Sequence, residues 1–305
     1  MSTTRRRPAT GNLDWDRDGH DWPNRDASRF VRAAGLTWHV QQMGSGPTLL
    51  LVHGTGASTH SWRGLAPALA KTFTVVAIDL PGHGFTSRPP TDRMSLDGMA
   101  QDLAGLLEVL EIRPDLVAGH SAGAAILCRM VLDGRIAPAG IVSLNGALLA
   151  FRGFAGQIFS PLAKLLAINT TAARLVAGFS SRRSVERIID ETGSTLDQAG
   201  LDLYARLVAS PRHVGSTLTM MANWNLDEFE RDLRKLQVPL LLLVGSHDRA
   251  VPPSAADKVR RIVPGATVET QRRAGHLAHE EQPEATAALI ADFAHRLKGP
   301  VAAQA

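Results

Sequence analysis

The chain has 305 residues, about twice the size of a typical domain, so its length alone predicts one large domain or two small ones. With 44% hydrophobic and 20% charged residues it has the composition of a globular protein, which excludes an intrinsically disordered chain. Its net charge of +4, spread over this length, produces only a weak electrostatic field, so no nucleic acid is expected as a partner.

Residues 1–35 read as a polar, highly charged N-terminal arm, with Trp15, Trp22 and Phe30 as isolated apolar side chains. Two interpretations stay open: a mobile arm, or an arm whose tryptophans dock on the body of the protein or on a partner. Basic residues 5–7 are followed by charged residues where a signal peptide needs an apolar segment, so no secretion signal is expected.

From residue 37 onward, short apolar runs alternate with amphipathic stretches. Strands are predicted at residues 37–41, 48–52, 74–78, 115–118, 140–144, 240–244 and 266–270. Helices are predicted between them, at residues 62–71, 95–110, 122–132, 254–263 and 283–297. Nearly continuous apolar strands separated by helices are typical of the α/β class, with a mostly parallel sheet that helices cover on both faces.

Residues 146–235 break this rhythm, because they contain helical stretches at 160–177, 184–192 and 196–209 and no convincing strand. An all-helical insertion between two strands of one sheet predicts a cap. We therefore expect one catalytic core, interrupted by the cap, with short extensions at both ends. The expected parts are the arm at 1–35, the core at 36–145 and 236–299, the cap at 146–235 and a tail at 300–305.

The chain carries no long apolar segment. The longest apolar runs, residues 48–52 and 239–244, have the length of strands, so no transmembrane segment is expected. Cys128 is the only cysteine, which excludes a disulfide framework and predicts a reducing, cytoplasmic environment. A loose peripheral association with a membrane stays open.

Residues 119–123 read Gly-His-Ser-Ala-Gly and lie between a predicted strand and a predicted helix. In this context the Gly-x-Ser-x-Gly pattern predicts a nucleophile elbow. The tight turn presents Ser121 at the start of a helix, where backbone N–H groups and the helix dipole favour developing negative charge. The alternative is a serine that only caps the helix, and the strand–turn–helix context favours the nucleophile.

A serine nucleophile needs a base and a carboxylate that orients the base. Asp248 and His276 follow predicted strands, at the sheet edge where Ser121 is expected, in the chain order Ser, Asp, His. Asn145 occupies the competing acid position and cannot supply an anion. His279 is the rival base, expected instead as a surface or cap contact. We predict a triad of Ser121, Asp248 and His276.

The predicted oxyanion hole consists of two backbone N–H groups, those of Ala122 in the elbow and Thr55 in the sequence His-Gly-Thr-Gly at 53–56. We expect the Asp-Leu-Pro-Gly-His-Gly turn at 79–84 to shape the pocket wall. The helical spacing of Met220, Met221 and Trp224 in the cap predicts either packing in the core or the lining of an apolar chamber. We therefore expect the substrate to be an apolar small molecule. The expected pocket residues are His53, Gly54, His120, Met220, Met221 and Trp224.

No metal site is expected. The group His276, His279 and Glu280 does not have the spacing of a helical zinc-protease motif. Cys128, on the helix after the elbow, is most simply a packed core residue.

With these motifs, residues 36–297 resemble the α/β-hydrolase superfamily. The resemblance implies the α/β-hydrolase fold with an inserted helical cap, the triad Ser121–Asp248–His276 and no organic cofactor. Ser121 departs from the haloalkane dehalogenases and epoxide hydrolases of that superfamily, which carry an aspartate at the elbow.

A narrower resemblance is carried by residues 13–25, which read Leu-Asp-Trp-Asp-Arg-Asp-Gly-His-Asp-Trp-Pro-Asn-Arg, and by two cap segments, Phe179-Ser180 and the Met-Met-Ala-Asn-Trp of 220–224. They are similar to the magnesium-chelatase accessory proteins of bacteriochlorophyll biosynthesis in phototrophic bacteria. This resemblance implies a tie to the insertion of magnesium into protoporphyrin, a tetrapyrrole intermediate as ligand, and contact with magnesium-chelatase components.

Three hypotheses follow from the sequence. The first is a serine hydrolase that acts on an apolar ester or acyl compound as an accessory to magnesium chelation. The second is a porphyrin-binding or chelatase-assisting protein whose triad is incidental. The third is a general esterase or carbon–carbon bond hydrolase outside pigment metabolism.

Overall fold

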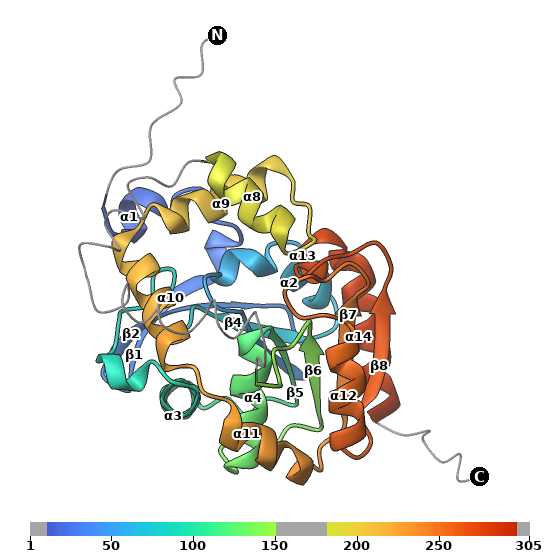
Figure 1. The fold of residues 1–305 in the computed structure, drawn as a ribbon. Coiled ribbons are helices and arrows are strands. Elements are labelled where there is room, and N and C mark those ends of the chain that lie inside the picture. Colours follow the sequence, from blue (N-terminus) through green and yellow to red (C-terminus); the bar gives the residue numbers. More distant parts are fainter. Residues whose placement is uncertain (1–10, 151–181, 298–305) are drawn as a thin grey trace.

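A single mostly parallel sheet runs through the protein, as the strand pattern predicts. The structure is a computed structural model that describes residues 11–150 and 182–297 (Figure 1). Within them, an 8-stranded sheet has the order β1-β2-β4-β3-β5-β6-β7-β8. From β4 to β8 neighbouring strands pair in parallel, whereas β2 pairs antiparallel with both β1 and β4. The strands are β1 (Ser28–Ala33), β2 (Leu36–Met43), β3 (Thr48–Val52), β4 (Thr74–Ile78), β5 (Leu116–His120), β6 (Gly140–Leu144), β7 (Leu240–Gly245) and β8 (Thr267–Gln271).

Helices cover both faces of the sheet (Figure 1). Helices α3 (Leu96–Val109), α4 (Ala122–Leu132) and α12 (Ser254–Ile262) pack apolar side chains against one face. Helices α2 (Leu65–Leu69) and α14 (Pro283–Leu297) pack against the other. The central strands β3 to β7 are almost wholly buried and therefore apolar on both sides.

Local rules explain where these elements begin and end. The Ser95 side chain caps α3 by accepting a hydrogen bond from the Gly98 N–H at 3.2 Å. The strands predicted at 48–52, 74–78 and 140–144 coincide with β3, β4 and β6. The helix predicted at 62–71 is shorter, since the chain forms a 3-10 turn, η2 (Thr59–Trp62), before α2.

Strand β1, which the sequence pattern does not predict, places residues 28–33 in the sheet instead of in an arm. The segment before it docks on the body, one of the two alternatives left open. Trp22 is 2% exposed, and its indole N–H donates to Thr59 Oγ1 at 3.1 Å. The Arg25 guanidinium lies over the Trp15 ring, 4.6 Å from its centroid. This segment includes α1 (Trp15–Asp18) and η1 (Arg25–Ala27).

The described chain between β6 and β7 is helical. It contains α8 (Arg182–Glu191), α9 (Gln198–Val208), α10 (Pro211–Asn223), α11 (Asp227–Asp232) and η4 (Leu233–Lys235). We call α8, α9 and α10 the cap helices. The helix predicted at 160–177, the Phe179-Ser180 pair and the tail at 300–305 lie outside the described residues.

The cap helices and the N-terminal segment bind each other. The Arg206 guanidinium of α9 pairs with the Asp21 carboxylate at 2.6 Å, and the Leu13 N–H donates to Ser210 Oγ at 3.4 Å. Two further short elements lie in the core, η3 (Thr91–Arg93) and α13 (Ala278–Glu281). Among the described helices, none combines the length and apolarity needed to cross a membrane.

Candidate active site

Ser121 occupies a strained turn between β5 and α4. Its backbone has φ 50° and ψ −116°, in a region that non-glycine residues rarely adopt. A Cβ at Gly123 would collide with the Val52 carbonyl oxygen, so the helix start can approach β3 only with glycine there. The Ser121 side chain makes no capping hydrogen bond, which argues against the alternative of a simple helix cap.

Asp248 and His276 form a buried hydrogen-bonded pair. His276 Nδ1 lies 2.9 Å from Asp248 Oδ2, and the two side chains are 10% and 0% exposed. The other carboxylate oxygen accepts the N–H groups of Ala250 and Val251, each at 2.8 Å. With Nδ1 facing the carboxylate, the neutral imidazole leaves Nε2 as its proton acceptor.

His276 lies beside the elbow. Its ring packs against that of His120, the residue before Ser121, with a centroid distance of 4.7 Å. His120 Nε2 also lies 2.9 Å from the His276 carbonyl oxygen, which fixes the loop that carries this histidine. Within the described residues no hydrogen bond joins Ser121 to His276. Such contacts are often loose in unliganded sites and tighten when substrate binds.

The loop at residues 53–57 crosses the elbow closely. A Cβ at Gly54 would lie 3.0 Å from Ser121 Cβ, so the backbone approaches the serine where a side chain would not fit. The Ala57 N–H donates to the Gly54 carbonyl at 3.2 Å, and Gly56 has φ +78°, as in a type II turn. The N–H groups of Thr55, in this turn, and Ala122, at the start of α4, have no acceptor among the described residues.

His53 joins two loops. Its Nδ1 lies 2.7 Å from the Gly54 carbonyl oxygen, and its Nε2 accepts the Leu80 N–H at 2.9 Å. Burial lowers the pKa of His53, which favours the neutral ring that this pattern requires. The side chain has no exposed surface, and its two hydrogen bonds make His53 a support of the 53–57 loop. His120, 3% exposed, lies equally deep.

Of the predicted cap residues, Met220 contacts this loop. Met220 of α10 is fully buried, and its Sδ accepts the Thr55 hydroxyl at 3.5 Å. Met221 and Trp224 are half-buried. Trp224 packs against the larger core cluster. Helix α10 therefore places the Met220 side chain next to the turn that carries the Thr55 N–H.

Asn145 has a role that the sequence analysis did not find. It is buried with φ +48°, and its amide donates to Asp248 Oδ2 at 2.6 Å and to the Gly275 carbonyl at 3.3 Å. Sequence reasoning treated Asn145 only as the absence of a competing acid. A hydrogen-bonding side chain directly after a strand that ends at this edge was the available signal.

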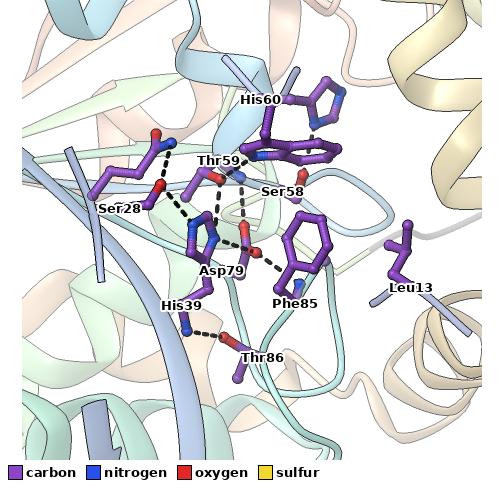
Figure 2. A network of polar contacts seen from close by, with 12 residues as sticks. Leu13, Ser28, His39, Ser58, Thr59, His60, Asp79, Phe85 and Thr86 are labelled. Carbon is purple, nitrogen blue, oxygen red and sulfur yellow. Dashed lines mark hydrogen bonds and ion pairs between the residues drawn. The ribbon is translucent and has the colours of Figure 1, made fainter. Parts of the chain in front are cut away.

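Asp79 organises a buried polar network that extends beyond the predicted turn at 79–84. Its carboxylate lies 2.8 Å from His39 Nδ1 and accepts the N–H groups of Thr59 at 2.6 Å and Phe85 at 2.9 Å (Figure 2). Burial alone would raise the pKa of Asp79, but His39 and the Phe85 N–H hold it well below the usual range. His39 Nε2 lies 3.0 Å from Ser28 Oγ, so the network reaches β1.

His279 is not the surface or cap contact that we expected. It is fully buried, and its Nε2 lies 2.7 Å from Ser61 Oγ. Burial, and then the charge of a protonated His276, lower the pKa of His279 to about 3. Glu280 Oε1 accepts the hydroxyls of Ser61 at 2.8 Å and Tyr204 at 2.7 Å. Tyr204 belongs to α9, so this cluster joins a cap helix to the core beside the candidate base.

Among the described residues, no group of three or more His, Cys, Asp or Glu side chains is placed to hold a metal ion. Cys128 is fully buried on α4, and burial raises the pKa of its thiol to about 12. Its thiolate is therefore scarce at neutral pH, and Cys128 is a poor competitor for the role of nucleophile.

A model of the alpha/beta hydrolase family matches residues 49–289, and the chain belongs to that family. The chain is 38% identical to the magnesium-chelatase 30 kDa subunit of Rhodobacter capsulatus over 276 residues, 90% of this chain and 96% of that protein. It is 30% identical to the pyrrolizixenacetamide deacetylase of Xenorhabdus hominickii over 266 residues, 82% and 91% of the two chains. A solved α/β hydrolase fold protein from Burkholderia ambifaria superposes with a TM-score of 0.74 at 25% identity, covering 88% and 98%. The family resemblance inferred from the motifs is confirmed.

Proposed function

We propose that the protein is a serine hydrolase in which Ser121 is the nucleophile, His276 the general base and Asp248 the carboxylate that orients the base. The observation that carries the proposal is the 2.9 Å Asp248–His276 pair, packed through His120 against the strained Ser121 turn. Strain of this kind at a nucleophile between a strand and a helix is typical of catalytic turns.

The reaction proceeds through an acyl-enzyme. Ser121 Oγ attacks the substrate carbonyl carbon, and its proton passes to His276 Nε2. The carbonyl oxygen becomes an oxyanion that accepts the N–H groups of Thr55 and Ala122. The tetrahedral intermediate collapses, the bond to the leaving group breaks, and His276 gives it the proton. Water then attacks the acyl-enzyme by the same path, releasing the acid and restoring Ser121.

The substrate class we propose is an apolar ester or similar acyl compound. Its support is Met220, buried beside Thr55 of the 53–57 loop, together with the half-buried apolar side chains of Met221 and Trp224 in the same stretch of the cap. The pathway we propose is bacteriochlorophyll biosynthesis, at the step that inserts magnesium into a porphyrin. The ligand would be a tetrapyrrole intermediate of that pathway. The name and 38% identity of the Rhodobacter capsulatus relative support this pathway. That name also favours the second candidate, a chelatase-assisting binder that needs no hydrolysis.

A fluorophosphonate probe tests the chemistry directly. It reacts when Ser121 Oγ displaces fluoride from phosphorus, a step that needs the same base and oxyanion donors. We expect mass spectrometry to find the label on Ser121 in the wild type, and labelling to fall by at least about a hundredfold in His276→Ala. Ser121→Ala is the matched control for labelling elsewhere.

Complementation separates the two candidates. If Ser121 remains unlabelled in folded protein while Ser121→Ala still supports pigment synthesis, the hydrolase proposal fails and the binder remains. A labelled Ser121 together with loss of pigment synthesis in Ser121→Ala supports a hydrolase within that pathway. If Ser121 is labelled in the wild type but Ser121→Ala still supports pigment synthesis, the protein is a hydrolase outside that pathway.

A further inference from the structure

His213, on cap helix α10, bridges two loops of the core. It is 2% exposed, its Nε2 lies 3.0 Å from the Gly56 carbonyl oxygen, and its Nδ1 accepts the Gly84 N–H at 3.1 Å. A backbone N–H can only donate, so Nδ1 is the acceptor and Nε2 carries the proton given to Gly56. One neutral tautomer satisfies both loops.

The surroundings keep His213 in this form. Burial lowers its pKa to about 4, while the hydrogen bond to Gly56 partly opposes that shift. At neutral pH the ring is therefore uncharged and retains one donor and one acceptor. No other proton arrangement of the ring makes both hydrogen bonds.

The Gly56 contact lies within the turn that presents the Thr55 N–H. The same face of α10 lies beside this turn at two more positions: Thr217 Cγ2 is 3.5 Å from where a Gly56 Cβ would be, and Met220 Sδ accepts the Thr55 hydroxyl at 3.5 Å. His213, Thr217 and Met220 are spaced four and three residues apart, so they form one stripe along the helix. Of the three, only His213 fixes the backbone of the turn by a hydrogen bond.

We infer that His213 is a positioning residue that holds the 53–57 loop, and with it the Thr55 N–H, in place for the oxyanion. The inference rests on the proposed hydrolase function. Because His213 belongs to α10, its hydrogen bond to Gly56 couples the position of this cap helix to that of the Thr55 N–H. A ligand that displaces α10 also displaces the donor.

Two substitutions separate the two hydrogen bonds of His213. In His213→Gln the terminal amide nitrogen replaces Nε2 and keeps the bond to Gly56, whereas in His213→Asn the side-chain oxygen replaces Nδ1 and keeps the bond to Gly84. With p-nitrophenyl butyrate as the probe, we expect kcat of His213→Asn and His213→Ala to fall by about tenfold to a hundredfold with KM nearly unchanged. His213→Gln retains kcat within about threefold, since the loop anchor remains.

Val214→Ala is the matched control, because it removes buried packing from the same helix without touching either loop. It is expected to lower the melting temperature without lowering kcat. Fluorophosphonate labelling rates follow kcat across the series if the inference holds. Equal losses in His213→Gln and His213→Asn, losses that track melting temperature, or failure of both variants to fold would assign His213 a purely structural role and overturn it. An unreactive wild-type Ser121 overturns the hydrolase proposal instead.

Discussion

Replacing Glu280 with glutamine should stabilise the protein at pH 8 and have little effect near pH 5. Glu280 is buried, its Oε1 accepts the hydroxyls of Tyr204 and Ser61, and its Oε2 has no partner among the described residues. Burial raises its pKa from 4.5 to about 7, against the lowering effect of those two hydroxyls. Folding therefore retains a proton that the unfolded chain releases at lower pH.

The size of the change in unfolding free energy follows from the difference between the pKa of Glu280 in the folded chain and in the unfolded chain. Between pH 4.5 and about 7 the folded chain binds more protons at Glu280 than the unfolded chain does, so stability falls as pH rises through this window. Integration from pH 5 to pH 8 gives a loss of about 2.5 kcal/mol for the wild type. Glutamine does not titrate, and its amide keeps an oxygen in place to accept the two hydroxyls.

Urea unfolding at pH 5 and pH 8, for the wild type and Glu280→Gln, measures this loss. The difference in unfolding free energy between the two proteins should change by about 2.5 kcal/mol in favour of the variant at the higher pH. Tyr204→Phe removes a hydroxyl that lowers the pKa of Glu280, so it should extend the loss to higher pH. A difference that is the same at both pH values would mean that Glu280 is not protonated in the fold, and the reasoning would be refuted.

Three further predictions concern the site and its supports. Asn145→Ala should lower kcat for p-nitrophenyl butyrate by about tenfold, because Asp248 loses a buried donor; unchanged kcat would contradict that role. Asp79→Asn should lower the unfolding free energy in urea by about 3 kcal/mol, since the amide cannot replace the ionised partner of His39; a loss below about 1 kcal/mol would count against it. Gly123→Ala should abolish fluorophosphonate labelling, as its Cβ cannot fit against β3, and normal labelling would show that the elbow tolerates the methyl group.

The parts of the site that follow local rules could be predicted from the sequence. Ser121, Asp248 and His276 each follow a strand of the sheet, and parallel strands end at one edge, so their spacing in the chain does not matter. Strands β3 to β7 were equally predictable because helices cover both faces of the sheet there, which makes these strands almost continuously apolar. Each of these inferences needs only a short window of sequence and a general rule of α/β topology.

What could not be predicted depends on contacts between distant segments. Strand β1 reads Ser-Arg-Phe-Val-Arg-Ala, without the apolar run of a buried strand, because it lies at one edge of the sheet and pairs only with β2. The partners of Asn145 and His213 lie 103 and 157 residues away. His279 reads as a polar surface residue, and only the Ser61 hydroxyl and the Trp62 ring packed against it make a buried position acceptable.

The burial of Cys128 has a practical consequence for observing the cap. Because this thiol is the only one in the chain and is shielded inside α4, a second cysteine placed on the surface would be the sole site open to maleimide dyes. Ile188, 55% exposed on α8, offers such a position. A fluorophore or spin label attached there reports on cap motion in the otherwise native protein, without first removing a natural cysteine.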